Sequence, residues 1–251
     1  MPRAVVLGCS HALGAEMDLE PGLEWGSGRD RWQYGAQHSY PVLIAQALGY
    51  TPENHAVSGG SNDAMFRIFE SLFGYDWRRD SYSPTLTSQD IVIACWTGMN
   101  RTEIWHESER HWLAMSPGTG RYCQRVTDPY ILEGLSIPSV VQDESLYLDY
   151  QAAWVNFAAD DQSGRSNKIK NILALNALAA AHDIRVVNIN SFAPAVNFKF
   201  PALVKWPVTV DFITWAEQRQ EPRTALRHYF RPTHQAFADH VIAGCVESIL
   251  I

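Results

Sequence analysis

Three short, mostly apolar runs, each followed by small or polar residues, constrain the fold of this chain more than any other feature. They cover residues 4–8, 90–95 and 184–189. The run at 91–94 is continuous and apolar, which is typical of a strand buried on both faces, as in a parallel sheet. Segments with helical spacing separate the three runs, so strands and helices alternate along the chain. This alternation predicts an α/β fold, a three-layer αβα sandwich with a mainly parallel sheet.

The expected helices carry recognisable start and stop signals. Residues 40–48 have apolar side chains at helical spacing and are followed by Gly49, a typical C-cap. A helix over 63–73 follows Ser61 and Asn62, either of which is a natural N-cap. The other expected elements are a short strand at 55–57, helices at 144–158, 167–182 and 233–250, a short helical or strand piece near 208–218, and loops at 15–39 and 74–88.

Length and charge bound the class of protein. The chain has 251 residues, of which 46% are hydrophobic and 19% charged, and its formal net charge is −7. No repeat, low-complexity tract or linker divides it, so we expect one domain over 1–251. Residues 102–140 lack periodicity and contain several Pro and Gly, which indicates an insertion or a lid-like excursion; a surface for a protein partner is a further possibility there. The negative charge and the absence of a basic run argue against nucleic-acid binding.

The cysteines and the longest apolar runs indicate a cellular compartment. Cys9, Cys95, Cys123 and Cys245 form no CxxC pair and no metal-ligand spacing, so we expect buried free thiols, no metal and no cofactor. No apolar run approaches the ~20 residues of a membrane-spanning helix, so no membrane partner is expected. Met1-Pro2-Arg3 leads into a strand without a signal-peptide pattern. These features predict a protein made in the cytoplasm.

Small and polar residues at three strand ends form a candidate site. Ser10 follows the strand expected at 4–8, Gly59 follows the short strand expected at 55–57, and Asn100 follows the strand expected at 90–95. The carboxyl ends of parallel strands share one edge of the sheet, where ligands bind in open α/β folds. A serine nucleophile needs a histidine base and N–H donors for the developing oxyanion. Backbone N–H groups of Ser10 and Gly59 and the Asn100 amide are suitable donors. Structural roles are open as well: Ser10 and Gly59 as turn residues, and Asn100 as the N-cap of a segment over 101–106.

On these residues the chain resembles the SGNH (GDSL-like) hydrolase family. Gly8-Cys9-Ser10 stands where the family has Gly-Asp-Ser, with the serine as nucleophile. Residues 54–59 fit its Asn-x-x-x-x-Gly block, and residues 39–49 look like its first helix. Residues 98–101 keep the Gly and Asn of its Gly-x-Asn-Asp block, with Arg101 in place of the last Asp. The resemblance implies the flavodoxin-like SGNH hydrolase fold.

The family's fourth block, Asp-x-x-His-Pro before the last helix, fits this chain in three registers. Aligning Pro232-Thr233 puts Arg231 at the position of the base, which implies an inactive protein. Aligning the helix body puts His228 there, and the histidine nearest the helix start is His234. No register has an acidic residue three positions upstream. A carbonyl, a water or a remote carboxylate such as Asp211 would then orient the imidazole.

The histidines also have non-catalytic interpretations. The alternative for both His228 and His234 is a surface histidine near a helix start. His11, beside Ser10, is expected to be a loop residue that lines the pocket.

The resemblance implies a serine esterase that deacylates a substrate through an acyl-enzyme on Ser10. The implied substrate is an ester, above all an O-acetylated carbohydrate. Gly59, Asn100 and the Ser10 N–H would bind the oxyanion, and His234 or His228 would be the base. An aromatic content of 12% also suits sugar stacking.

The alternative is a catalytically inactive protein of the same fold with a structural or binding role. The Gly-Cys-Ser-His start and the pattern from Trp96 to Arg101 look similar to SGNH-like proteins encoded by bacteriophages, some of which are virion components. Arg231 and the excursion at 102–140 favour this alternative, in which the protein would become part of a virion.

Overall fold

A four-stranded parallel sheet forms the centre of the molecule. The computed structural model describes residues 1–23, 28–57, 60–76, 81–82, 85–99, 101–106, 111–115, 161–192, 200–224 and 228–248. The strand order is β2-β1-β5-β8, and every pairing in this sheet is parallel. The strands are β1 (Arg3–Leu7), β2 (Thr51–Asn54), β5 (Ile91–Trp96) and β8 (Arg185–Asn190). Every residue of β5 is buried, as its continuous apolar run predicts.

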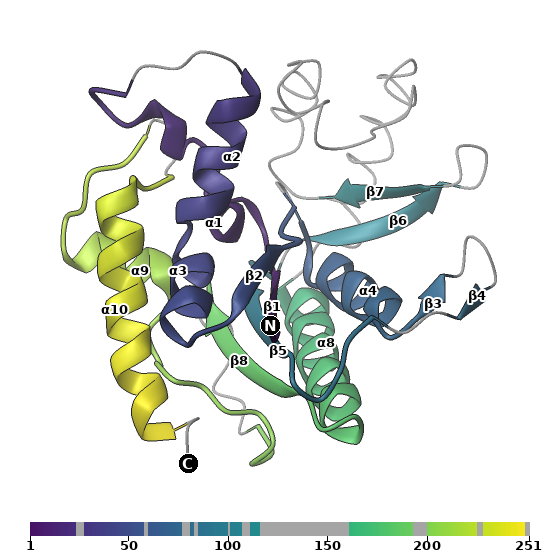
Figure 1. The fold of residues 1–251 in the computed structure, drawn as a ribbon. Helices are drawn as coiled ribbons and strands as arrows, with labels where there is room; N and C mark the ends of the chain where they lie inside the picture. Colours follow the sequence, from purple (N-terminus) through teal and green to yellow (C-terminus); the bar gives the residue numbers. More distant parts are fainter. Residues whose placement is uncertain are drawn as a thin grey trace.

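Helices cover both faces of the sheet (Figure 1). Alternate residues of β1 face opposite layers: Ala4 and Val6 belong to one apolar cluster, and Val5 and Leu7 to the other. The first cluster contains residues of α3, α9 and α10, and the second residues of α4 and α8. The three-layer αβα sandwich is therefore confirmed. The helices run over α3 (Tyr40–Ala47), α4 (Asn62–Leu72), α8 (Asp161–Ala181), α9 (Phe212–Gln218) and α10 (Arg231–Ser248).

The loop expected over 15–39 is wrong. This stretch contains η1 (Met17–Leu19) and α2 (Gly28–His38), after the single-turn helix α1 (Ser10–Leu13). The sequence of α2 is mostly polar, so it carries no apolar stripe at helical spacing. A close backbone contact between α2 and the end of α1 takes the place of such a stripe. A Cβ added to Gly35 would lie 2.2 Å from the Gly14 carbonyl oxygen, so this approach requires glycine.

The other differences from the expected elements are small. The strand expected at 55–57 is β2, a few residues earlier, although His55 and Val57 still donate to the carbonyls of Val6 and Gly8 at 2.9 and 3.0 Å. Two antiparallel hairpins occupy stretches expected to be irregular: β3 (Tyr75–Asp76) with β4 (Ser81–Tyr82), and β6 (Thr102–His106) with β7 (His111–Met115). The helix expected at 144–158 and most of the 102–140 excursion lie outside the described residues.

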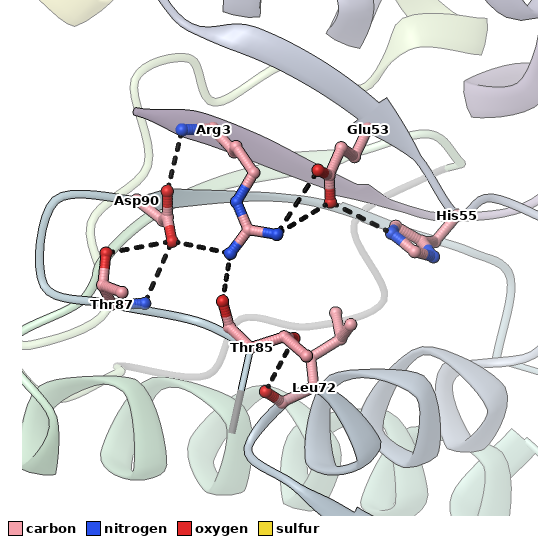
Figure 2. Close-up of polar contacts among 7 residues, drawn as sticks. All are labelled: Arg3, Glu53, His55, Leu72, Thr85, Thr87 and Asp90. Atoms are coloured by element: carbon pink, nitrogen blue, oxygen red, sulfur yellow. Dashed lines mark hydrogen bonds and ion pairs between the residues drawn. The ribbon is translucent and has the colours of Figure 1, made fainter. Parts of the chain in front are cut away.

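Arg3, the first residue of β1, contacts Glu53 of β2 and Asp90, the residue before β5 (Figure 2). Its backbone N–H donates to Asp90 Oδ1 at 2.8 Å, and its guanidinium pairs with Asp90 Oδ2 at 3.0 Å and Glu53 Oε1 at 3.3 Å. Burial alone would raise the pKa of Asp90, but hydrogen bonds from Arg3 and Thr87 lower it below its ordinary value. Asp90 is therefore an ionised anchor, and these polar contacts serve structure.

The described cysteine side chains and the helices agree with the sequence expectations. Cys9 and Cys95 are buried free thiols, as expected, whereas the side chains of Cys123 and Cys245 lie outside what the structure describes. No helix in the described part of the chain is long and apolar enough to span a bilayer.

Candidate functional site

Ser10 stands on a sharp turn from strand to helix at the carboxyl end of β1. Cys9 is the N-cap of α1, and Ser10 is the first residue of that helix. The turn depends on Gly8, because a Cβ there would lie 2.4 Å from Ala12 Cβ. Ser10 is 3% exposed, and among the described residues no side chain hydrogen-bonds its hydroxyl. Ser10 is therefore held by its backbone with an uncommitted Oγ.

Gly59 and Asn100 lie outside the described residues, but the segments beside them meet at Ser10. A Cβ on Gly60 would lie 3.0 Å from the Gly8 carbonyl oxygen, so the segment after β2 packs directly on the turn. Across the same edge, Asn62 Oδ1 accepts from the Thr97 N–H at 3.0 Å, which joins the start of α4 to the end of β5. The three strand ends thus converge, as the sequence predicts, while the oxyanion roles of Gly59 and Asn100 stay predictions.

His234 is enclosed by the protein. It is 1% exposed, and its Nδ1 accepts the Tyr40 backbone N–H at 3.1 Å. Burial and the nearby His228 lower the pKa of His234 to about 3, against a hydrogen bond to the Tyr229 backbone that raises it. The ring is therefore neutral at physiological pH, with hydrogen bonds on both sides. These contacts give it a structural task between α3 and α10.

The buried neutral ring of His234 predicts a loss of stability in acid. The unfolded ring titrates near pH 6.5 and the folded ring near pH 3, so only the unfolded state takes up the proton between these values. The free energy of unfolding should fall by about 1.4 kcal/mol per pH unit from this ring as the pH drops below 6.5. Buried His11 has a lowered pKa and adds a loss of the same sign.

Urea unfolding at pH 7.5, 6.5, 5.5 and 4.5 measures this loss. His234→Gln should have a shallower dependence on pH than the native chain, and His55→Gln, at a half-exposed surface histidine, should not. Equal slopes for His234→Gln and the native chain would contradict the assignment.

His228 contacts a carboxylate, that of Glu16, which the sequence analysis does not assign to it. Its Nδ1 lies 3.1 Å from Glu16 Oε2, and the same oxygen accepts the Thr224 hydroxyl at 2.6 Å. The His228 backbone N–H donates to Thr224 Oγ1 at 3.2 Å, so one threonine fixes both partners. Glu16 itself has a left-handed backbone, with φ of 61°, which is uncommon for a residue other than glycine. Glu16 is the functional candidate that sequence reasoning missed.

Asp211 does not orient either histidine. It is the N-cap of α9, and its Oδ1 accepts the Thr214 N–H at 2.9 Å. In the described part of the chain, neither His228 nor His234 hydrogen-bonds it. The suggestion of Asp211 as the remote carboxylate is therefore replaced by Glu16. Arg231, which one alignment puts at the base position, is exposed and begins α10.

His11 links His228 to the Ser10 turn. It is a buried residue of α1 rather than the loop residue expected, and its ring centroid lies 4.7 Å from that of His228. Phe192 and Phe212 flank the same ring at 5.1 and 5.8 Å. Burial, with His228, His234 and Arg101 nearby, holds the pKa of His11 well below its ordinary range. The neutral imidazole of His11 therefore packs against the ring of His228, the candidate base, and against the rings of Phe192 and Phe212.

Buried polar atoms gather beneath this edge of the sheet. Lys168, from α8, is 1% exposed, and burial lowers its pKa to about 8 although Asp211 and Cys9 raise it. Several buried polar atoms have no hydrogen-bond partner among the described residues: His11 Nδ1, Thr97 Oγ1, Lys168 Nζ, Asn190 Oδ1 and Asp211 Oδ2. Within the described ranges, no group of three or more His, Cys, Asp or Glu side chains could hold a metal ion.

Comparisons with known proteins return solved structures alone. No protein-family model matches the chain, and no curated protein matches it. The chain is similar to an acetyl xylan esterase, Est2A, from the rumen bacterium Butyrivibrio proteoclasticus, with a TM-score of 0.46, 10% identity and coverage of 99% of this chain and 64% of that one. It is similar to a family two carbohydrate esterase from Cellvibrio japonicus, with a TM-score of 0.44, 15% identity and coverage of 98% and 61%.

A third similar structure is a member of the lipolytic protein G-D-S-L family from Veillonella parvula DSM 2008. Its TM-score is 0.32, with 10% identity and coverage of 100% of this chain and 99% of that one. The chain thus spans less than two thirds of the two carbohydrate esterases and nearly the whole of the third protein.

Proposed function

We propose that this protein is an SGNH-like serine esterase in which Ser10, His228 and Glu16 form the catalytic triad. The observation that carries the proposal is the contact of 3.1 Å between His228 Nδ1 and Glu16 Oε2, beside the segment that bears Ser10. A histidine held by a carboxylate is the pair that activates a hydroxyl nucleophile, and we propose that His228 acts on Ser10 in this way. His228 is chosen over His234 because the His234 ring is buried with hydrogen bonds on both sides.

The proposed reaction has two halves. His228 Nε2 takes the Ser10 Oγ proton while Oγ attacks the ester carbonyl, and the oxyanion is held by the N–H groups of Ser10 and Gly59 and the amide of Asn100. The C–O bond then breaks, and the imidazolium returns its proton to the leaving alcohol. Water attacks the acyl-enzyme by the same route, releasing the carboxylic acid and free Ser10. Glu16 accepts the Nδ1–H and stabilises the imidazolium. Hydrogen bonds between nucleophile and base are often loose in unliganded enzymes and tighten with substrate.

We propose an O-acetylated carbohydrate as the substrate. This choice rests on the resemblance of residues 8–10, 54–59 and 98–100 to the family's blocks and on the aromatic content of the chain.

Covalent labelling tests the nucleophile directly. A fluorophosphonate probe should add one mass equivalent to the native protein, and peptide mapping should place it on Ser10. Ser10→Ala should take up no probe, whereas Ser71→Ala, at an exposed serine of α4, should be labelled like the native chain. A folded native protein that takes up no probe would contradict the proposal. That result would favour the non-catalytic binding protein, the virion component included.

A further inference from the structure

Arg101 contacts two segments beside the candidate site. Its Nη1 lies 3.5 Å from the Gly60 carbonyl oxygen, in the segment after β2 that packs on Gly8. Its Cζ lies 5.1 Å from the ring centroid of Phe192, which follows β8. The Phe192 ring is also 5.1 Å from the ring of His11, the neighbour of Ser10. One guanidinium therefore touches both sides of the strand edge at which Ser10 lies.

Arg101 uses little of its hydrogen-bonding capacity within the residues that the structure describes. A guanidinium has five N–H donors, and within the described residues Arg101 makes one long contact with a carbonyl and no contact with a carboxylate. The nearby Arg67 shows the contrast, because it binds Glu103 through two hydrogen bonds of 2.9 and 2.8 Å. The carboxylate two positions after Arg101 is therefore committed elsewhere. The ring of Phe192 holds the guanidinium in place while leaving its donor edge available.

Carboxylates described near Arg101 are engaged with other residues and leave its positive charge without a contact. The chain has a net charge of −7, so its overall charge does not favour the binding of anions. At this edge, Glu16 is bound to His228 and Thr224, and Asp211 caps α9. Neither carboxylate is in contact with Arg101. A second cation, Lys168, is buried there without a hydrogen-bond partner in the described part of the chain. The edge therefore offers positive charge that described carboxylates do not contact.

We propose that Arg101 binds a carboxylate group of the ester, so that this enzyme prefers acidic esters to neutral ones. The inference rests on the proposed function, since it places the carboxylate next to a reaction at Ser10. A planar guanidinium binds a carboxylate through paired hydrogen bonds, which neither lysine nor glutamine can reproduce. The alternative role for Arg101, stabilisation of the oxyanion, makes a different prediction, because it would serve every ester equally.

Three phenyl esters separate these roles. Phenyl acetate is neutral, 4-acetoxybenzoate has a carboxylate on its alcohol side, and monophenyl adipate has one on its acyl side. Arg101→Gln should lower kcat/KM about 10- to 100-fold for one of the acidic esters, mainly through KM, because charged hydrogen bonds are lost. The rate for phenyl acetate should stay within about two-fold. The acidic ester that responds identifies the side of the substrate that carries the carboxylate.

The control is another arginine stacked on an aromatic ring. Arg219 lies 4.8 Å from the ring centroid of Trp215 and pairs with Glu221, so Arg219→Gln removes a similar contact away from the site. It should leave all three rates unchanged. Arg101→Lys keeps the charge without the fork and should fall between native and Arg101→Gln for the responsive ester.

Binding without turnover separates this inference from the esterase proposal. Calorimetric titration of 4-acetoxybenzoate and monophenyl adipate into Ser10→Ala should show binding that weakens about 10-fold or more when Arg101→Gln is added. This result would support the anion site even if Ser10 proved not to be a nucleophile. An equal loss for neutral and acidic esters, or unchanged rates and binding in folded Arg101→Gln, would overturn the inference. If Arg101→Gln does not fold, Arg101→Lys gives the same comparison.

Discussion

Ser10→Ala is expected to lower kcat/KM for ester hydrolysis by about 10³-fold or more, because the covalent route loses its nucleophile. The residual rate would come from binding and from the oxyanion donors. The fold should be unaffected, since no described side chain hydrogen-bonds the Ser10 hydroxyl. Initial rates with phenyl acetate, together with thermal melting of the same samples, measure both effects.

A second buried serine gives the opposite pattern and serves as the control. Ser61 caps α4, where its Oγ accepts the Ala64 N–H at 3.0 Å. Ser61→Ala should cost about 1 kcal/mol of stability and leave the rate of the folded protein nearly unchanged. If Ser10→Ala kept more than a tenth of the native rate, the acyl-enzyme mechanism would be wrong.

His228→Ala is expected to lower kcat by about 10³-fold or more, and Glu16→Gln by about 10²- to 10⁴-fold with KM little changed. The reason is that Glu16 fixes the tautomer of His228 and stabilises its charged form. In Glu16→Gln an amide still reaches the His228 ring, but the negative charge of the carboxylate is lost. Steady-state kinetics with phenyl acetate gives both parameters. Glu16→Asp should recover part of the rate if the carboxylate reaches the ring.

The double variant distinguishes a triad from independent structural roles. Once His228 is alanine, Glu16→Gln should cause almost no further loss of rate, because the two residues act as one unit. Additive losses would instead mean that Glu16 supports the fold and not the base.

His234→Gln is the matched comparison: its kcat per folded molecule should stay close to native while its stability falls, because His234 lies between α3 and α10. A collapse of kcat in folded His234→Gln, with His228→Ala active, would reverse the choice of base.

The sequence predicts the layers of this fold because they depend on local patterns. The runs that form β1 and β5 are continuous and apolar, the run that forms β8 is mostly apolar, and Ser61 caps α4 as its residue type suggests. The helix α2 escapes prediction because its position depends on the contact between Gly14 and Gly35, which leaves no periodic signal. The sequence pattern predicts an element where buried side chains recur at regular spacing. It fails where a close contact between two backbones positions the element.

The candidate site is less predictable, since its decisive contacts span the chain. The sequence places Ser10 at a strand end and two histidines near the start of the last helix, and it cannot choose between them. Burial and hydrogen bonding separate the two rings in the structure. Glu16 carries no local signal, because it meets His228 across 212 positions of sequence.

That separation links the site to the order in which the chain is made. Thr224 and His228 leave the ribosome 208 and 212 residues after Glu16, so a chain that has not reached them holds the proposed nucleophile without its proposed base. Docking of the segment that contains Thr224 and His228 completes the pair of His228 and Glu16, and local detachment of this segment would separate them. If the proposed function holds, hydrolytic activity would therefore report on the attachment of this segment. A protease that cleaves shortly before His228 should then abolish the activity before the central sheet unfolds.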